Sequence, residues 1–188
     1  EVVCLDGWQE ILRAYCKQFG ISKLANVVEG GENGQSSIRN GLWDLKEMYD
    51  ENDLVLIHDA IRPMVSEEII SDAIRVCKKY GNSISVIPCA EAMLKTEDGV
   101  SSLEQIPRDN LKRTQTPQTF VLKDIVAAHE EALEKGITNS VASCTLYIEL
   151  GKKLYFSAGS EKNIKLTTPD DIDIFKSILV TRKSEWMK

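Results

Sequence analysis

An aspartate and an arginine stand just after a short apolar run, in the segment Ile57-His58-Asp59-Ala60-Ile61-Arg62-Pro63. The run itself, Leu54-Val55-Leu56-Ile57, is bounded by charged residues and is typical of a parallel strand buried on both faces. Asp59 would then lie at the carboxyl edge of a sheet, where open α/β proteins place their ligands. A carboxylate there suits a ribose or a metal ion, and the Arg62 guanidinium suits a phosphate. The alternative is an Asp–Arg ion pair that only holds the loop.

A pair of glycines follows a second expected strand, Asn26-Val27-Val28-Glu29. Gly30 and Gly31 would let the backbone approach a ligand closely, and the helix that begins near Ser37 would offer free N–H groups. Most Gly-Gly loops are only turns, and the spacing is neither a dinucleotide-binding G-x-G-x-x-G nor a P-loop. The loop is therefore a candidate ligand site only in combination with other signals.

Two further segments could serve a phosphate group. Arg108 and the segment Arg113-Thr114-Gln115-Thr116-Pro117-Gln118 combine guanidinium groups with hydroxyls and amides, although solvated loops have the same composition. Lys165 is expected on a short strand before a helix N-terminus, where its ammonium could neutralise charge that develops on a phosphate. A solvated lysine on an edge strand is the other interpretation.

The composition excludes several classes of protein. The net charge of −6 argues against non-specific binding to nucleic acid, and no apolar run approaches the roughly 20 residues that span a bilayer. The five cysteines are odd in number and show no close pairing, which favours reduced thiols in a cytoplasmic protein. His58 and His129 are the only histidines, so we expect neither a multi-histidine metal site nor a Ser-His-Asp triad.

Strands that alternate with amphipathic helices predict an α/β fold with a mostly parallel, Rossmann-like sheet. We expect a buried first strand at residues 2–5, followed by a helix that Asp6 caps and whose apolar residues share an inner face. Ser66 and Thr168-Pro169 are start signals for later helices.

The segment 89–113 is polar and contains a turn signal, Glu97-Asp98-Gly99, which predicts a β-hairpin arm. Such an arm has little core of its own and would pack on something else, for example a second subunit. We expect residues 1–188 to form one domain that carries this arm.

In this order, four of these segments resemble the cytidylyltransferases that act on 2-C-methyl-D-erythritol 4-phosphate and on D-ribitol 5-phosphate. Members of that family carry a Gly-Gly loop with a later Ser, then HDAxRP, an arm, TPQxF, and NIKxT near the end. The corresponding segments here are Gly30-Gly31 with Ser37, His58 to Pro63, Thr116 to Phe120, and Asn163 to Thr167. The resemblance implies a nucleotidyltransferase fold, Mg²⁺ carried by CTP, release of pyrophosphate and a homodimer through the arm 89–113.

The resemblance also implies a role for each matching residue. The residues implied in CTP binding are Gly30, Gly31, Glu32, Ser37, Asp59, Ala60 and Thr167. Those implied in acceptor binding, partly across the dimer, are Arg62, Arg108 and Thr116. Lys165 would stabilise the pentacoordinate α-phosphate, and Asp59 would sit between nucleotide and polyol; no protein residue is implied as a metal ligand. An acceptor phosphate oxygen attacks in line, so positioning and charge neutralisation suffice.

The chain departs from the family's pattern in three places. The family's Gly-rich loop LAAGxGxRM and its PKQ segment, which hold the triphosphate, are not among the 188 residues, so we expect them before Glu1 and expect the chain alone to be inactive. Glu91-Ala92 stands where the family usually has Asp-Thr, and Val141-Ala142 where it usually has Thr-Asp, unless Thr138-Asn139 takes that place. Both changes concern the acceptor pocket, whereas Gln115 before Thr116 resembles the ribitol phosphate group.

The favoured function is therefore transfer of CMP from CTP to D-ribitol 5-phosphate. The alternative in the same class is the 2-C-methyl-D-erythritol 4-phosphate cytidylyltransferase of isoprenoid biosynthesis. A different class also stays open, namely a non-catalytic nucleotide-binding or dimerisation module.

Overall fold

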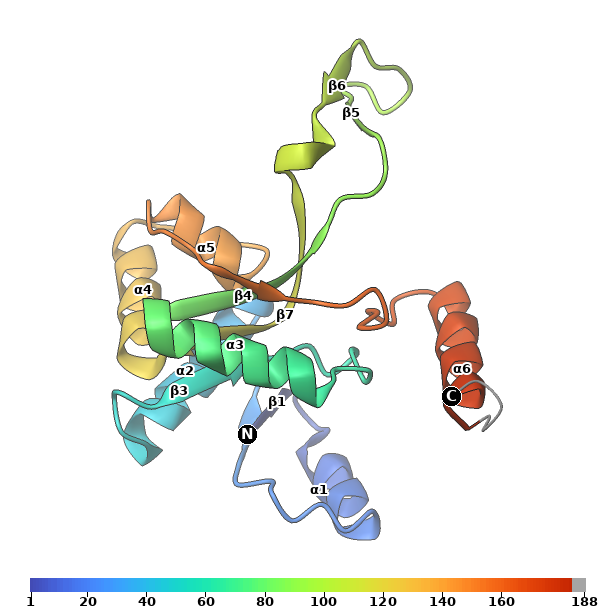
Figure 1. Ribbon diagram of the computed structural model, residues 1–188. Coiled ribbons are helices and arrows are strands. Elements are labelled where there is room, and N and C mark those ends of the chain that lie inside the picture. The colour runs from blue at the N-terminus through green and yellow to red at the C-terminus, as the bar shows by residue number, and fades with distance from the viewer. Residues whose placement is uncertain (184–188) are drawn as a thin grey trace. The chain divides into compact units, whose positions relative to one another are not determined.

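The computed structural model describes residues 1–183, with side chains up to Thr181, and the expected alternation of strands and helices is present (Figure 1). The strands are β1 (Val2–Cys4), β2 (Val27–Glu29), β3 (Leu54–Ile57), β4 (Asn82–Pro88), β5 (Met93–Lys95), β6 (Glu104–Ile106), β7 (Lys112–Val121) and β8 (Phe156–Ala158). The helices are α1 (Gln9–Gln18), α2 (Gly34–Met48), α3 (Glu67–Tyr80), the 3-10 helix η1 (Arg108–Asn110), α4 (Leu122–Glu134), α5 (Ser143–Glu149) and α6 (Pro169–Lys183). Along residues 1–183, no helix combines the length and the apolar character needed to cross a membrane.

The chain divides into two compact units. Unit 1 comprises Glu1–Ile57 and Thr119–Leu154, and unit 2 comprises His58–Gln118 and the chain from Tyr155 onward. Strand β7 contributes its first residues to unit 2 and its last three to unit 1.

In unit 1 the core forms around α2 and α4. Helix α2 packs against α4 and against the parallel pair β1–β2, in which Val2 lies opposite Val27. Leu42 of α2 and Ile125 of α4 are buried, and the Phe120 ring lies 4.7 Å from that of Tyr147 on α5. Helix α2 begins at Gly34, earlier than the expected start near Ser37, because the Asn33 side chain accepts a hydrogen bond from the Ser36 N–H and so caps its first turn.

The expected inner face of α1 is wrong. Trp8, Tyr15 and Phe19 all lie on the surface of the described chain, each more than half exposed. Asp6 is not the cap either, because Gly7 (φ 79°) turns the chain before the helix begins at Gln9, with Trp8 as N-cap and no side-chain cap. Leu5 is also exposed, and the first strand is only half-buried. Spacing predicts that a helix has an apolar face but not what covers that face.

In unit 2 a sheet in the order β7-β4-β8 is covered by α3. β4 and β8 run parallel with Ile84 opposite Phe156, and between them the Ser83 hydroxyl donates to the Ser157 hydroxyl at 2.8 Å. The Ser66 side chain caps α3, as predicted, and Gly81 ends it with a positive φ of 88°.

The arm is a hairpin, as predicted. β5 and β6 pair antiparallel with each other, and the loop that joins them is organised by the Asp98 carboxylate, which accepts hydrogen bonds from the backbone N–H groups of Val100 and Ser101. These hydrogen bonds hold the pKa of Asp98 well below its usual range. In Figure 1 the hairpin stands away from β4 and β7.

Three local expectations need correction. β3 is half-buried along its length instead of buried on both faces. The segment from Arg113 to Gln118 belongs to the long strand β7, so a solvated loop is excluded. Lys165 lies in the irregular segment between β8 and α6, not on a strand.

Candidate active site

Three charged residues singled out from the sequence come together in unit 2. Arg62 Nε donates to Asp59 Oδ2 at 3.1 Å, and Lys165 Nζ lies 3.3 Å from the same carboxylate oxygen. The side chains of Arg62, Asp59 and Lys165 are 11%, 30% and 45% exposed, so the lysine is the most accessible of the three. One carboxylate between two cations leaves a net positive charge at this position, which suits a phosphate group.

Backbone contacts tie the two segments that carry these side chains. Arg62 N–H donates to the Asp59 carbonyl at 2.9 Å and closes a tight turn after β3. Leu166 N–H donates to the Ile61 carbonyl at 2.9 Å, and Arg62 Nη1 donates to the Asn163 carbonyl at 2.7 Å. The guanidinium is therefore anchored through two of its nitrogens and keeps Nη2 for a further partner.

Thr116 of β7, together with His58 next to Asp59 in the chain, fixes the position of Asp59. The Asp59 N–H donates to the Thr116 hydroxyl at 3.0 Å, and that hydroxyl lies 3.0 Å from His58 Nδ1. His58 Nε2 lies 3.1 Å from the Arg62 carbonyl, which can only accept, so Nε2 carries a proton and in a neutral ring Nδ1 accepts from Thr116. The sequence identified Thr116 as an acceptor contact; the structure shows that its hydroxyl also holds the Asp59 turn.

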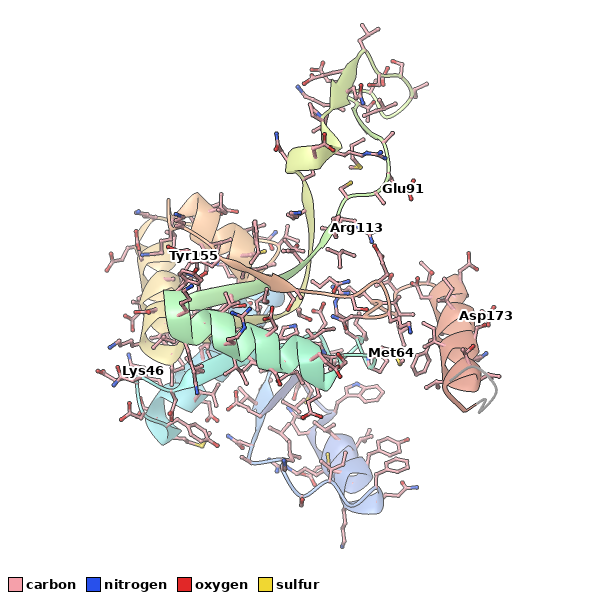
Figure 2. The ribbon with its side chains drawn as sticks, in the orientation of Figure 1. Lys46, Met64, Glu91, Arg113, Tyr155 and Asp173 are labelled. Carbon is pink, nitrogen blue, oxygen red and sulfur yellow. The ribbon has the colours of Figure 1, made fainter. Side chains whose placement is uncertain are left out.

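Arg108 lies at the base of the arm, outside this cluster. Its Nη1 donates to the Ala90 carbonyl, and no contact among the described residues joins it to Asp59 or Lys165. Figure 2 labels Glu91 and Arg113, which lie on the chain that enters and leaves the arm.

In unit 1 the glycine loop is organised by the first turn of α2. The Ser37 hydroxyl accepts from the Gly31 N–H at 3.0 Å and donates to the Asn33 carbonyl at 2.8 Å. A Cβ atom on Gly31 would lie 2.3 Å from Ser36 Oγ, so this close approach requires glycine. Glu32, the remaining predicted member of this loop, is exposed.

The other residues implied in CTP binding lie in unit 2. Ala60 and Thr167 are exposed, the first in the turn that carries Asp59. The Thr167 hydroxyl donates to Asp171 Oδ2 at 3.0 Å, and hydrogen bonds from the Thr167 N–H and from Thr168 lower the pKa of Asp171 to about 2. Thr167 thus helps to form the start of α6.

Sequence reasoning did not predict that three amide side chains are buried and hold loops in place. In unit 1, Gln35 donates to the Ile137 carbonyl at 2.7 Å and accepts from the Ser140 N–H at 2.6 Å. In unit 2, Gln115 and Asn163 are buried and hydrogen-bonded to each other at 3.3 Å. Their positions between recognised motif residues were the available signal, but an amide side chain alone does not reveal its partner.

A family profile, similar sequences and similar solved structures all indicate the same family for this chain. The family profile described as IspD, 2-C-methyl-D-erythritol 4-phosphate cytidylyltransferase, matches residues 9–181. A ribitol-5-phosphate cytidylyltransferase of Lacticaseibacillus paracasei is 40% identical over 180 residues, which are 95% of this chain and 77% of the relative. A 2-C-methyl-D-erythritol 4-phosphate cytidylyltransferase of Clostridium acetobutylicum is 38% identical over 173 residues, 91% of this chain and 71% of the relative. The crystal structure of 4-diphosphocytidyl-2C-methyl-D-erythritol synthase from Anaerococcus prevotii superposes with a TM-score of 0.81 at 25% identity, over 95% of this chain and 77% of that one.

Proposed function

The chain belongs to the IspD family of cytidylyltransferases, and we propose that it transfers CMP from CTP to D-ribitol 5-phosphate, giving CDP-ribitol and pyrophosphate. The observation that carries the proposal is the Asp59 carboxylate held between Arg62 and Lys165, with one accessible cation beside one anchored cation. This arrangement suits a reaction between two phosphate groups, in which negative charge accumulates as they approach.

In the proposed reaction, an oxygen of the acceptor phosphate forms a bond to the α-phosphorus of CTP. The bond from that phosphorus to the bridging oxygen of the β-phosphate breaks, and pyrophosphate leaves with the electron pair. Lys165 neutralises charge on the α-phosphate in the transition state, and Arg62 holds the acceptor phosphate through its free Nη2. Asp59 positions both cations, while Arg108 and Thr116 add acceptor contacts.

The nucleotide contacts are proposed from the motifs that the chain shares with the family. The first turn of α2 and the close backbone approach that Gly31 allows suit the cytosine and ribose. The proposed contacts are Gly30, Gly31, Glu32, Ser37, Asp59, Ala60 and Thr167.

Mg²⁺ is proposed to enter on the triphosphate of CTP. Along residues 1–183 no group of three His, Cys, Asp or Glu side chains has the arrangement of a metal site, and the Asp59 carboxylate already faces two cations. These residues therefore fit a metal ion held mainly by substrate phosphate oxygens, which is a common mode for Mg²⁺. When bound, the ion would neutralise charge on the phosphates.

The choice of acceptor rests on the relatives. Ribitol 5-phosphate is favoured because the relative that is 40% identical is a ribitol-5-phosphate cytidylyltransferase, while 2-C-methyl-D-erythritol 4-phosphate remains the second candidate, supported by relatives such as the one that is 38% identical. Incubating the complete gene product with CTP, Mg²⁺ and each polyol phosphate, and measuring pyrophosphate, decides between them. Faster turnover of the methylerythritol phosphate would select the second candidate.

A non-catalytic module is the competing class of function. If the complete gene product binds CTP but releases no pyrophosphate with either polyol phosphate, this class replaces the enzyme. A Lys165→Ala variant provides the matched control, because its pyrophosphate release should fall to a low residual rate while its CTP binding stays close to that of the wild type.

The arm is proposed to mediate a homodimer. β5 and β6 pair with each other, and a two-stranded hairpin alone is marginally stable in water. Its residues Leu94 and Leu103 are strongly exposed. A Leu94→Ser and Leu103→Ser double variant should therefore sediment as a monomer where the wild type sediments as a dimer; a monomeric wild type would contradict the proposal. A cytoplasmic location is part of the same proposal and is supported by the five free cysteines.

A further inference from the structure

The segment that carries Lys165 has no regular structure of its own, although Lys165 must be placed accurately to act on a phosphate. β8 ends at Ala158 and α6 begins at Pro169, and the residues between them form turns and irregular backbone. Backbone hydrogen bonds join this segment to other parts of unit 2 at Gly159, which donates to the Val86 carbonyl at 2.9 Å, and at Leu166. Between these two points the Asn163 N–H donates to the Ser160 carbonyl at 3.0 Å and closes a turn, so side-chain contacts must anchor the stretch from Ser160 to Lys165.

The buried carboxamide of Gln115 supplies those contacts from β7. Its Nε2 donates to the Ser160 carbonyl at 2.9 Å, and its Oε1 accepts from the Ser160 N–H at 3.1 Å. One side chain thus pairs with both the N–H and the carbonyl of one residue, as the opposite residue of an antiparallel strand would. The Gln115 side chain therefore provides strand-like hydrogen bonds to the chain that follows β8.

Asn163 extends this contact toward the charged residues. Its side chain is fully buried, and Nδ2 donates both to Gln115 Oε1 at 3.3 Å and to the Thr116 carbonyl at 2.9 Å. Its own carbonyl accepts from Arg62 Nη1, and Lys165 follows two residues later. The neutral carboxamides of Gln115 and Asn163 therefore determine where the cations of Arg62 and Lys165 lie.

Gly159 gives an independent indication that the approach of Gln115 is tight. A Cβ atom at this position would lie 2.6 Å from Gln115 Oε1 and 3.0 Å from the Val86 carbonyl oxygen. Its φ is not positive, so the backbone conformation itself does not demand glycine. Glycine is required at position 159 because the space beside the Gln115 carboxamide is too small for a Cβ atom.

We infer that Gln115 is a positioning residue for the transferase reaction, which acts through Asn163 to set the place of Lys165. This inference rests on the proposed function for its catalytic consequence, but the positioning itself does not. Because Gln115 is buried and its carboxamide is hydrogen-bonded to Ser160, its loss should lower kcat and leave the KM values for CTP and for the acceptor close to those of the wild type.

The test uses Gln115→Leu in the complete gene product. A displacement of about 1 Å at a catalytic group can cost about 100-fold, so we expect a fall in kcat of about that size. In a Lys165→Ala background the same change should have no further effect on kcat, because the group that Gln115 positions is gone. An equal fall in both backgrounds would show that Gln115 contributes only to general stability and would overturn the inference.

Gly159→Ala provides a second variant that keeps the buried amide. It disturbs the same contact from the other partner and should lower kcat in the same Lys165-dependent way. Ser83→Ala is the matched control, because it removes a buried hydrogen bond between β4 and β8 outside the site and should leave kcat unchanged.

Hydrogen exchange separates this inference from the proposed function. In Gln115→Leu, peptides that cover residues 159–166 should exchange at least about tenfold faster, while those of β4 keep their rate. Unchanged exchange at residues 159–166 would overturn the positioning role even if kcat falls. If the wild type transfers CMP to neither polyol phosphate, the proposed function fails, and the exchange measurement alone decides whether Gln115 holds this segment.

Discussion

Replacing Asp59 by asparagine removes the negative charge between two cations and keeps the shape of the side chain. In the wild type, Oδ2 lies 3.1 Å from Arg62 Nε and 3.3 Å from Lys165 Nζ. Arg62 is nearly buried, and it would face a neutral carboxamide, whose oxygen can still accept its hydrogen bond but no longer compensates its charge. Lys165 is accessible enough to turn toward water and would lose little.

The expected cost follows from this partial burial. An exposed ion pair contributes about 0–1 kcal/mol to stability, whereas removing one partner of a buried pair costs about 3–5 kcal/mol. With Arg62 11% exposed and Asp59 30% exposed, we expect the free energy of unfolding to fall by an intermediate amount, about 2 kcal/mol. This corresponds to a change of about 30-fold in the unfolding equilibrium constant.

Urea unfolding followed by circular dichroism at pH 7 measures this difference. Asp173→Asn is the matched control, since Asp173, labelled in Figure 2, forms an exposed pair with Lys176 at 3.5 Å. We expect the control to change stability by less than about 0.5 kcal/mol. Equal losses in the two variants, or a more stable Asp59→Asn protein, would refute the view that this carboxylate holds the cations in place.

Three further predictions concern other parts of the molecule. Gly31→Ala should destabilise the protein by about 1–3 kcal/mol and raise the KM for CTP, because its Cβ would lie 2.3 Å from a side-chain oxygen. Gly34→Ala has open space around it at the start of α2 and should be neutral or stabilising by up to about 1 kcal/mol. Equal changes of the two variants in urea unfolding would contradict the steric role of Gly31. Burial lowers the pKa of His129 to about 4, so the native state keeps this ring neutral while the unfolded chain takes up a proton below about pH 6.5. The free energy of unfolding should therefore be largest above pH 6.5 and fall by about 3 kcal/mol toward pH 4. In unfolding titrations, His129→Gln should remove that part of the pH dependence. Arg62→Ala should raise the KM for the polyol phosphate more than the KM for CTP in steady-state assays, and equal increases would remove Arg62 from the acceptor site.

The sequence predicted those elements whose ends carry their own chemistry. Ser66 could be recognised as the start of α3 because a hydroxyl cap acts locally. The hairpin followed from a turn that Asp98 organises with neighbouring N–H groups. Asp59 and Arg62 could be assigned to one site because they lie close together in the sequence.

What the sequence could not predict depends on contacts between distant segments. The apolar residues of α1 have helical spacing, but spacing does not tell whether another element covers them. Lys165 was expected on a short strand, whereas hydrogen bonds from the Gln115 and Asn163 side chains stand in place of strand pairing in this segment. Such amide contacts leave no periodic pattern in a single sequence.

The contacts of Gln115 have a consequence for how the site responds to its surroundings. The carboxamides of Gln115 and Asn163 do not ionise, and they are shielded from solvent. Dissolved salt therefore screens the attraction between the cations and a phosphate, but it acts only weakly on the amide framework behind those residues. A change of ionic strength should alter how strongly the site attracts phosphate while the hydrogen bonds of the two amides stay the same.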